Sequence, residues 1–122
     1  MNNKDFAIQL EKRTKEFALN VIKLTSKLPD SPEAKVIRYQ LAKSGTSIGA
    51  NYREANNSRS KADFKNKISI SAGEASETGY WLELIEQTSW MDTNDVGALL
   101  KEANELLVIF TSIRAKLNMK KL

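Results

Sequence analysis

The chain has 122 residues, which is enough for one domain with a hydrophobic core. It contains neither Cys nor His, which excludes disulfides, thiol catalysis, haem ligation and zinc sites and leaves carboxylates as the candidate metal ligands. Nineteen Lys plus Arg against fifteen Asp plus Glu give a formal net charge of +4, whose arrangement matters more than its size.

Residues 1–17 are charged throughout (MNNKDFAIQLEKRTKEF) and lack the uninterrupted apolar run of a signal peptide. No later run approaches the length of a membrane span. We therefore expect a soluble cytoplasmic protein with no membrane contact, no cofactor and no bound metal.

Four segments carry apolar or small residues at alternating steps of four and three, the period of helices packed at shallow crossing angles. We expect these helices at approximately residues 4–28, 32–57, 61–90 and 94–119, in a single domain that covers residues 1–122. In chain order, the repeating positions are Phe6, Leu10, Phe17, Val21, Leu24 and Leu28; then Ile37, Leu41, Ser44, Ile48, Asn51 and Ala55; then Phe64, Ile68, Ser71, Ala75, Thr78, Leu82 and Ile85; and last Val96, Leu99, Ala103, Leu106, Phe110, Ile113 and Leu117.

Capping residues mark where three of these helices begin. Ser31 before Pro32 is typical of an N-cap with proline at the first helical position, and Ser60 with Asp63 forms a capping box. Thr93 is expected to cap the last helix. Because the connections are short, sequential helices run antiparallel, and no period-two run indicates a strand. The sequence therefore predicts an all-α fold, an antiparallel up-down-up-down four-helix bundle.

One short stretch, GTSIG at residues 45–49, matches the Gly-x-Ser-x-Gly pattern that carries the nucleophile of α/β-hydrolases. A catalytic Ser needs a base, and without His only Lys43, four residues before Ser47, remains open for that role. The stretch lies in one continuous helical register, however, and not on a strand-to-helix turn. We interpret Gly45 and Gly49 as small residues that let a neighbouring helix approach, at about 1 kcal/mol of helix propensity each, and we expect no catalytic residue and no enzyme.

Several polar residues occupy positions where a simple bundle would carry Leu or Ile. Each needs a partner, because a buried unsatisfied polar group costs about 1–3 kcal/mol. Alignment of the second and third helices places Lys43 opposite Glu74 and Gln40 opposite Glu77. We favour a polar network that fixes helix register; a functional pocket and a ferritin-like carboxylate metal site are the alternatives, and the metal site lacks its usual Glu-x-x-His pairs. The network is predicted to contain Lys43, Ser47, Asn51, Glu54, Glu74 and Glu77.

The third helix carries a second stripe beside the first. A helix with so wide a face, which here includes Tyr80, can contact a second subunit. We therefore expect the protein to oligomerise. The second stripe consists of Ile70, Glu74, Glu77, Trp81 and Leu84.

The predicted topology sorts the charged residues by pole. One half, residues 1–16, 45–73 and 106–122, has thirteen basic and five acidic residues and a net charge of +8, and the other half has a net charge of −4. Four cations surround the start of the third helix, where the helix dipole disfavours them unless an anion binds. We expect this pole to bind the phosphate backbone of RNA or DNA, mainly by electrostatics because no base-reading element is visible; a solvated face and an acidic protein partner are the alternatives. The candidate nucleic-acid-binding residues are Arg53, Arg59, Lys61, Lys65, Lys67, Arg114, Lys116, Lys120 and Lys121.

Residues 47–84 (SIGANYREANNSRSKADFKNKISISAGEASETGYWLEL) resemble the four-helix-bundle proteins encoded within bacterial 23S rRNA intervening sequences. The resemblance lies in a Ser-Ile pair, an Asn three residues on, an acidic-small pair, a Ser before an aromatic helix start, and a third helix rich in Glu and Leu. The end of the first helix, VIKLTSKLP, is also similar, so the resemblance covers nearly the whole chain. Gly49, where relatives often carry Pro, and Asn56, where many carry Gly, depart from the pattern. The matching residues are Ser47, Ile48, Asn51, Glu54, Ala55, Ser60, Phe64, Glu74, Glu77, Thr78 and Leu82.

The resemblance implies a four-helix protomer that assembles into a ring, typically a homopentamer, through faces outside the bundle core. It also implies similarity to the accessory variability protein of diversity-generating retroelements, a basic pentameric barrel that binds nucleic acid and its reverse transcriptase. Two functions are therefore expected as alternatives: a non-enzymatic oligomer that binds RNA or DNA, or a scaffold whose main partner is another protein such as a reverse transcriptase.

Overall fold

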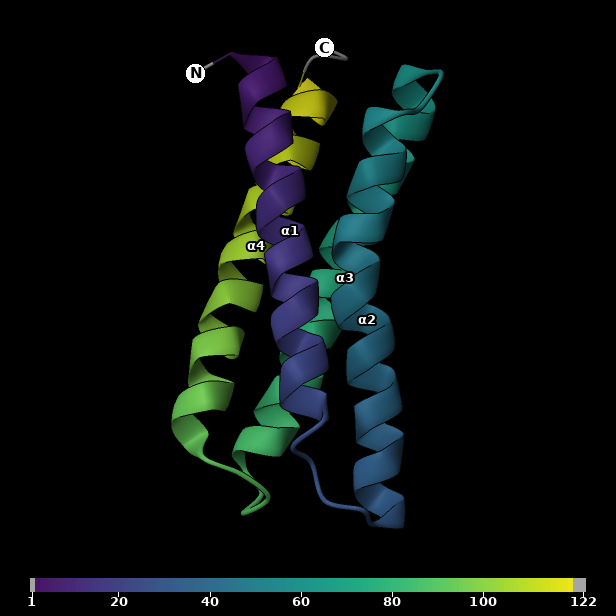
Figure 1. The fold of residues 1–122 in the computed structure, drawn as a ribbon. Helices are drawn as coiled ribbons and strands as arrows, with labels where there is room; N and C mark the ends of the chain where they lie inside the picture. The colour runs from purple at the N-terminus through teal and green to yellow at the C-terminus, as the bar shows by residue number, and fades with distance from the viewer. Residues whose placement is uncertain (1, 120–122) are drawn as a thin grey trace.

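The computed structural model describes residues 2–119, which form four long helices: α1 (Asn3–Thr25), α2 (Pro32–Asn56), α3 (Lys61–Glu86) and α4 (Thr93–Met119). Figure 1 shows the helices side by side and joined by short connections, so that successive helices run in opposite directions. No strand occurs among residues 2–119. The all-α antiparallel four-helix bundle predicted from the sequence is confirmed.

Side chains just ahead of α2 and α3 cap the starts of these helices. The Ser31 hydroxyl accepts a hydrogen bond from the Ala34 N–H at 3.2 Å, and Pro32 occupies the first helical position. The Ser60 hydroxyl accepts a hydrogen bond from the Asp63 N–H at 3.0 Å. Both predicted N-caps are confirmed.

The start of α4 differs from the prediction. Thr93 lies inside the helix, and the carboxylate of Asp92 accepts the hydrogen bond from the Asn94 N–H, at 2.8 Å. An Asp carboxylate serves a helix start at least as well as a Thr hydroxyl, because its negative charge also interacts favourably with the helix dipole.

The first helix ends at Thr25, before the expected residue 28, and Arg38 of α2 explains why. Its guanidinium donates hydrogen bonds to the backbone carbonyls of Thr25, Leu28 and Pro29, at 3.3, 2.9 and 3.0 Å. These carbonyls are therefore satisfied without a further helical turn, and Pro29 has no N–H with which to continue the helix.

The third helix ends at Glu86, before the expected residue 90. The Thr88 hydroxyl donates a hydrogen bond to the Ile85 carbonyl at 2.6 Å and accepts one from the Trp90 N–H at 3.3 Å. Such local side-chain bonds compete with helical ones. Trp90 and Met91, which follow, pack against the core instead of extending the helix.

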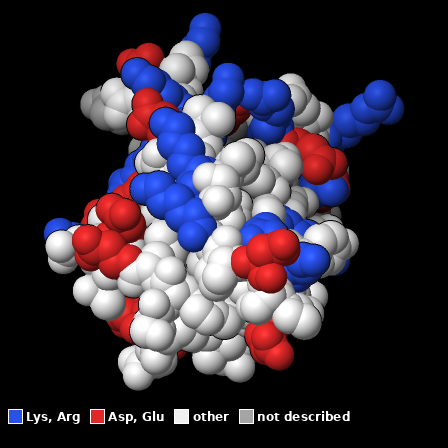
Figure 2. Space-filling model, turned by 60° about the horizontal axis from the view of Figure 1, so that its bottom comes forward, with Lys and Arg blue, Asp and Glu red and all other residues white. Residues whose placement is uncertain are grey.

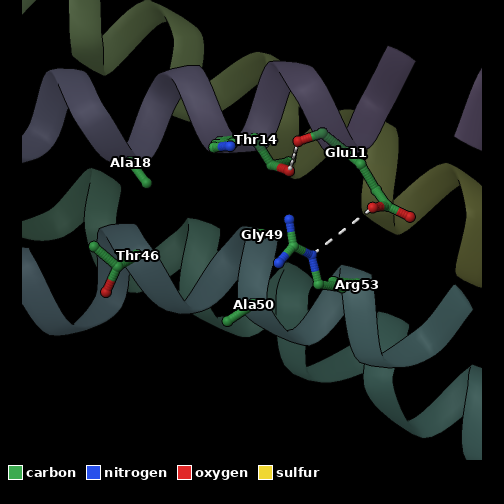
Figure 3. Close-up of a pocket in the computed structure, with 8 residues that line it drawn as sticks. Glu11, Thr14, Ala18, Thr46, Gly49, Ala50 and Arg53 are labelled. Atoms are coloured by element: carbon green, nitrogen blue, oxygen red, sulfur yellow. Dashed lines mark hydrogen bonds and ion pairs between the residues drawn. The ribbon is translucent and has the colours of Figure 1, made fainter. Parts of the chain in front are cut away.

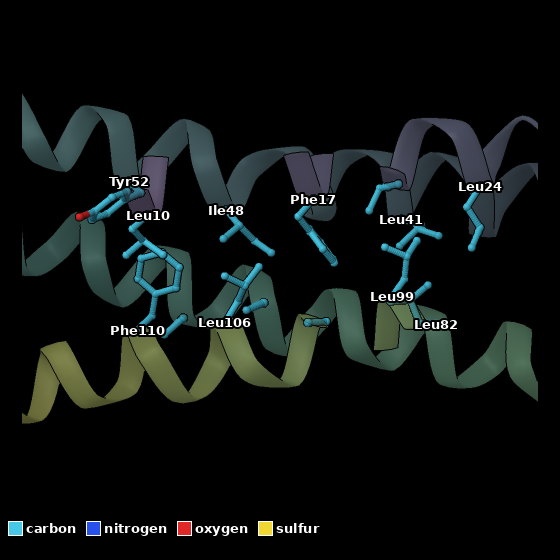
Figure 4. Close-up of a cluster of buried hydrophobic side chains, with 14 of the residues drawn as sticks. Leu10, Phe17, Leu24, Leu41, Ile48, Tyr52, Leu82, Leu99, Leu106 and Phe110 are labelled. Atoms are coloured by element: carbon cyan, nitrogen blue, oxygen red, sulfur yellow. The ribbon is translucent and has the colours of Figure 1, made fainter. Parts of the chain in front are cut away.

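The apolar stripes of the four helices meet in one core along the bundle (Figure 4). Phe17, Ile48 and Leu82 are among its fully buried side chains. Tyr52, which lies outside the predicted stripe, is buried as well, and its ring meets that of Phe110 edge-on with centroids 5.4 Å apart. The predicted stripes thus form the buried face of each helix.

Buried hydroxyl groups determine how α2 and α3 align. The Thr78 hydroxyl donates to the Ser44 hydroxyl at 2.9 Å, and the Ser71 hydroxyl donates to the Ile48 carbonyl at 3.0 Å. All three hydroxyl-bearing residues are fully buried, and no buried side-chain polar atom among residues 2–119 lacks a partner. Sliding α3 along α2 would break both contacts. The Thr78 hydroxyl also lies 2.7 Å from the Glu74 carbonyl of its own helix, so the larger loss falls on the Ser71 hydroxyl, at about 1–3 kcal/mol.

Two glycines let α1 approach α2 closely. A Cβ atom at Gly45 would lie 2.9 Å from both methyl carbons of Val21, and one at Gly49 would lie 2.9 Å from the Thr14 hydroxyl oxygen. Val21 and Thr14 are fully buried, so neither can move aside freely. The interpretation of the GTSIG stretch as a helix-packing element is confirmed.

We predict that Gly45→Ala destabilises the protein whereas Gly73→Ala stabilises it. Gly73 is an exposed residue in the middle of α3, and an added Cβ would meet nothing within 4 Å. Both substitutions gain the helix propensity of Ala, about 1 kcal/mol, but only Gly45→Ala overpacks the core against Val21, at about 1–3 kcal/mol. Urea denaturation measures the difference between the two variants, and equal effects at the two sites would contradict the close approach of α1.

Candidate nucleic-acid interface

The start of α1, the end of α2, the start of α3 and the end of α4 lie at the same end of the bundle, which we call the basic pole (Figure 1). Figure 2 turns the opposite pole toward the viewer: the lower part of this view is mostly uncharged surface with acidic groups, and blue side chains gather toward the top. The topology therefore brings cations from separate segments of the sequence to one end of the molecule.

Two of the predicted cations at this pole are held by the bundle's own carboxylates. Arg53 Nε lies 3.9 Å from the Glu11 carboxylate, an ion pair that spans the groove between α1 and α2 in Figure 3. Lys67 Nζ lies 3.3 Å from the Glu54 carboxylate. A phosphate that contacts Arg53 or Lys67 must compete with these carboxylates, so we expect both residues to contribute little to anion binding.

A second group of cations makes no ion pair with any carboxylate among residues 2–119. This group includes Arg59, Lys61 and Lys116. Arg59 and Lys61 line a hollow of about 600 Å³ together with Lys65, Phe64 and Leu117, between the α2–α3 turn and the end of α4. Among residues 2–119 no acidic side chain lines this hollow, which we call the cationic hollow.

The other flank of the α2–α3 turn has mixed charge. It is lined by Arg53, Arg59 and Lys67, but also by Glu54 and Asp63. A phosphate on that flank would meet two carboxylates as well as cations, and each carboxylate would repel it. The flank that faces α4 is therefore the better place for an anion.

The remaining predicted cations differ in their positions. Lys65 is half-buried beside the cationic hollow, and Arg114 is half-buried on α4 and lines neither the cationic hollow nor the hollow beside it. Lys120 and Lys121 lie outside the described residues.

A second hollow lies at the end of the bundle core, and the apolar stripes of the sequence do not predict it. All four helices line this space of about 480 Å³, through Phe6, Tyr52, Phe64, Ile113 and Leu117. We call it the aromatic hollow; it shares Phe64 and Leu117 with the cationic hollow, so the two adjoin. The available signal is that Phe6 and Phe64 are the first members of their stripes, and Phe6 is 42% exposed.

Tyr52 carries a neutral hydroxyl at the wall of the aromatic hollow. Burial raises the pKa of this hydroxyl and the charge of Glu11 raises it further, while a hydrogen bond with Asn56 acts in the opposite direction. Figure 4 shows the hydroxyl oxygen directed away from the apolar cluster. Because the group stays protonated at neutral pH, it can donate a hydrogen bond.

The predicted polar network centres on Glu74. Burial raises the pKa of the Glu74 carboxyl and the charge of Glu77 raises it further, while a hydrogen bond with Ser47 and the charge of Lys43 lower it. The charge of Lys43 thus acts on Glu74, but the two residues form no ion pair among residues 2–119. Asn51 instead donates to the Ser47 carbonyl within its own helix, at 2.8 Å.

The other acidic members lie apart from this centre. Glu77 is exposed and accepts a hydrogen bond from the Trp81 indole at 3.1 Å, and Glu54 is at the basic pole. The contacts that hold α2 and α3 in register are thus mainly the buried hydroxyls described above and not the carboxylates.

The hydroxyl of Ser47 donates to the Lys43 carbonyl at 2.6 Å, a bond typical of a Ser side chain within a helix. Among residues 2–119, no group of three or more acidic side chains is placed to hold a metal ion. No helix in this part of the chain is long and apolar enough to cross a membrane.

These features define an all-helical four-helix-bundle protein whose distinguishing surface is its basic pole. Residues 7–112 match the family described as 23S rRNA-intervening sequence protein, and the chain belongs to this family. A crystal structure of a protein of unknown function from the S23 ribosomal protein family of Bacteroides thetaiotaomicron VPI-5482 is 36% identical, with a TM-score of 0.79, over 85% of this chain and 96% of that one. Comparison with curated proteins gives no match.

We predict that Glu74→Gln raises the melting temperature at neutral pH. Because the pKa of Glu74 is raised in the folded protein, its ionisation opposes folding as the pH rises above the ordinary Glu range. Gln has nearly the same size and shape as Glu but cannot ionise. Melting curves between pH 4 and 7 should show a gain that disappears toward low pH; Glu83→Gln, at an exposed site on the same helix, is the control. A gain that is independent of pH would refute this account of Glu74.

Proposed function

We propose that the protein is a non-enzymatic binder of RNA or DNA that holds the phosphate backbone at the cationic hollow. The observation that carries this proposal is that Arg59 and Lys61 line a hollow without acidic residues and make no ion pair among residues 2–119. Lys116, which lines the adjoining aromatic hollow, is likewise without an ion pair in this part of the chain.

The distribution of ion pairs supports binding over solubility alone. Cations that serve solubility are usually interspersed with acids, as they are on the mixed flank around Glu54 and Asp63. At the same pole, Arg53 and Lys67 each lie near a carboxylate of the bundle, at 3.9 and 3.3 Å. Arg59 and Lys61 have no such ion-pair partner among residues 2–119, and uncompensated positive charge around a concave surface attracts polyanions.

The proposed contact is electrostatic and does not depend on sequence. Each helix buries one face in the core, and the cationic hollow lies at helix ends and a turn. The nucleic acid therefore contacts these ends, without a helix inserted into one of its grooves. Phosphate contacts of this kind position a nucleic acid without reading its bases. Affinity should therefore fall steeply with salt.

We predict that the double variant Arg59→Gln, Lys61→Gln binds a 20-nucleotide RNA or DNA more weakly than the unmodified protein. Each lost phosphate contact should also make the slope of log affinity against log salt shallower by about 0.7–0.9. Fluorescence anisotropy at several salt concentrations measures both quantities.

The matched control is Lys23→Gln, Lys101→Gln, which removes two exposed cations from the half of the molecule that contains the opposite pole. This control lowers the net charge equally and should leave the slope unchanged. Equal losses in the two double variants would show that net charge, and not the cationic hollow, governs binding.

Self-association through the outer face of α3 is a second proposal, carried by a partly apolar exposed stripe in which Glu74 and Glu77 separate Ile70 from Tyr80 and Leu84. Ile70, Tyr80 and Leu84 are 37%, 54% and 36% exposed and repeat at helical spacing on one face. The Tyr80 ring lies edge-on to Trp81, with centroids 5.0 Å apart, so part of this face is already ordered. A stripe of this kind on the solvent side of a helix suits a contact between subunits, and the homopentamer implied by the family resemblance would require such a contact.

We predict that Tyr80→Glu, Leu84→Glu lowers the sedimenting mass of the protein at micromolar concentration, because the charges would have to be buried between subunits. Val36→Glu, at an exposed site on α2, is the control and should leave the mass unchanged. If the unmodified protein sediments as a monomer near 13.7 kDa, the proposed self-association is wrong.

A further inference from the structure

The basic pole combines an apolar space with a charged one. The aromatic hollow is lined by the rings of Phe6, Tyr52 and Phe64, which come from three different helices. Phe64 also lines the cationic hollow, so a group that rests on this ring lies beside Arg59 and Lys61. An occupant that fits both spaces needs a flat apolar part with anionic groups next to it.

The size and depth of the aromatic hollow limit what can enter. Its volume of about 480 Å³ is in the range of small-molecule sites, about 300–1,000 Å³. Its inner wall is Tyr52, which is buried against Phe110 in an edge-on ring contact. A flat ring fits above this wall, whereas a long acyl chain would need a channel that continues into the core.

Among residues 2–119, apolar side chains are less covered at the basic pole than at the opposite pole. Phe6 is 42% exposed, and Phe64 is half-buried although it belongs to the apolar stripe of α3. At the opposite pole, Leu28, Trp90 and Met91 pack against the end of the core. Covering the basic pole in the same way would bury more apolar surface and stabilise the bundle.

We infer that the pole binds single-stranded RNA or DNA, with one unpaired base in the aromatic hollow and the neighbouring phosphates on Arg59, Lys61 and Lys116. This inference rests on the proposed nucleic-acid binding and adds the kind of strand and the mode of contact. Aromatic rings accept any base by stacking, which matches an interface that does not read sequence. In a duplex every base is already stacked and paired, so a base must be extruded at a cost before it can enter the hollow.

The test compares one oligonucleotide in two forms, a single strand with a central 2-aminopurine and the same strand annealed to its complement. The single strand should bind more tightly at equal salt, and its 2-aminopurine emission should be quenched on binding. Phe6→Ala and Phe64→Leu should each weaken binding of the single strand by about 5- to 100-fold. Affinity for the duplex and the salt slope should stay unchanged, because both depend on the phosphate contacts.

Tyr39→Ala is the matched control, because Tyr39 is a 64% exposed aromatic residue near the start of α2, away from the basic pole. Phe6 is partly exposed at the edge of the bundle, so Phe6→Ala tests the hollow even if Phe64→Leu loosens the core. Losses that are equal for single strand and duplex, or no loss at all, would overturn the base-binding hollow. If Arg59→Gln, Lys61→Gln still weakens binding in that case, the proposed function stands; failure of both strand forms to bind would overturn both proposals.

Discussion

The buried hydroxyl contacts between α2 and α3 determine how the groups that α3 carries to the basic pole lie relative to α2. The bonds from Thr78 to Ser44 and from Ser71 to Ile48 are made in the observed axial alignment and would be lost in a shifted one. Purely apolar stripes of similar residues tolerate such shifts more easily, which is why polar residues at seam positions specify register. A slide of one turn would move α3 by about 5.4 Å along α2 and would displace Phe64 from the two hollows.

The first helix is positioned by a different kind of contact. On one side, Gly45 and Gly49 bring it against α2, and on the other side Arg13 donates two hydrogen bonds to Glu102 of α4, at 2.6 and 2.7 Å. The ion pair is partly exposed, with 36% and 28% of the two side chains accessible, so it contributes at most about 1 kcal/mol. The close approach to α2 is therefore the stronger constraint on α1, and it also places Phe6 at the wall of the aromatic hollow.

The fold was predictable from the sequence because the stripes are long and regular, and most of their members are buried. The end of α1 was not, because it depends on the guanidinium of Arg38, a residue of the next helix. The resemblance seen in the sequence correctly predicted the protein family. The sequence did not predict which cations form ion pairs, because Arg53 contacts Glu11 only through the packing of α1 on α2. The stripe pattern likewise assigns Phe6 to the core and carries no information on whether another layer covers it.

The two poles of the bundle differ in how far the apolar side chains at the end of the core are covered. Trp90 and Met91 pack against the core near the pole at which α3 ends, so apolar surface there is removed from water. At the basic pole, Phe6 stays partly exposed and Arg59 has no carboxylate partner among residues 2–119, although Arg53 nearby has one. The exposed part of Phe6 forgoes burial that apolar groups gain at the other pole, whereas an exposed ion pair such as that of Arg53, whose side chain is 66% accessible, adds little stability. The proposed binding at this pole rests on partly exposed apolar side chains beside Arg59 and Lys61, which are unpaired among residues 2–119, and not on the net charge of +4.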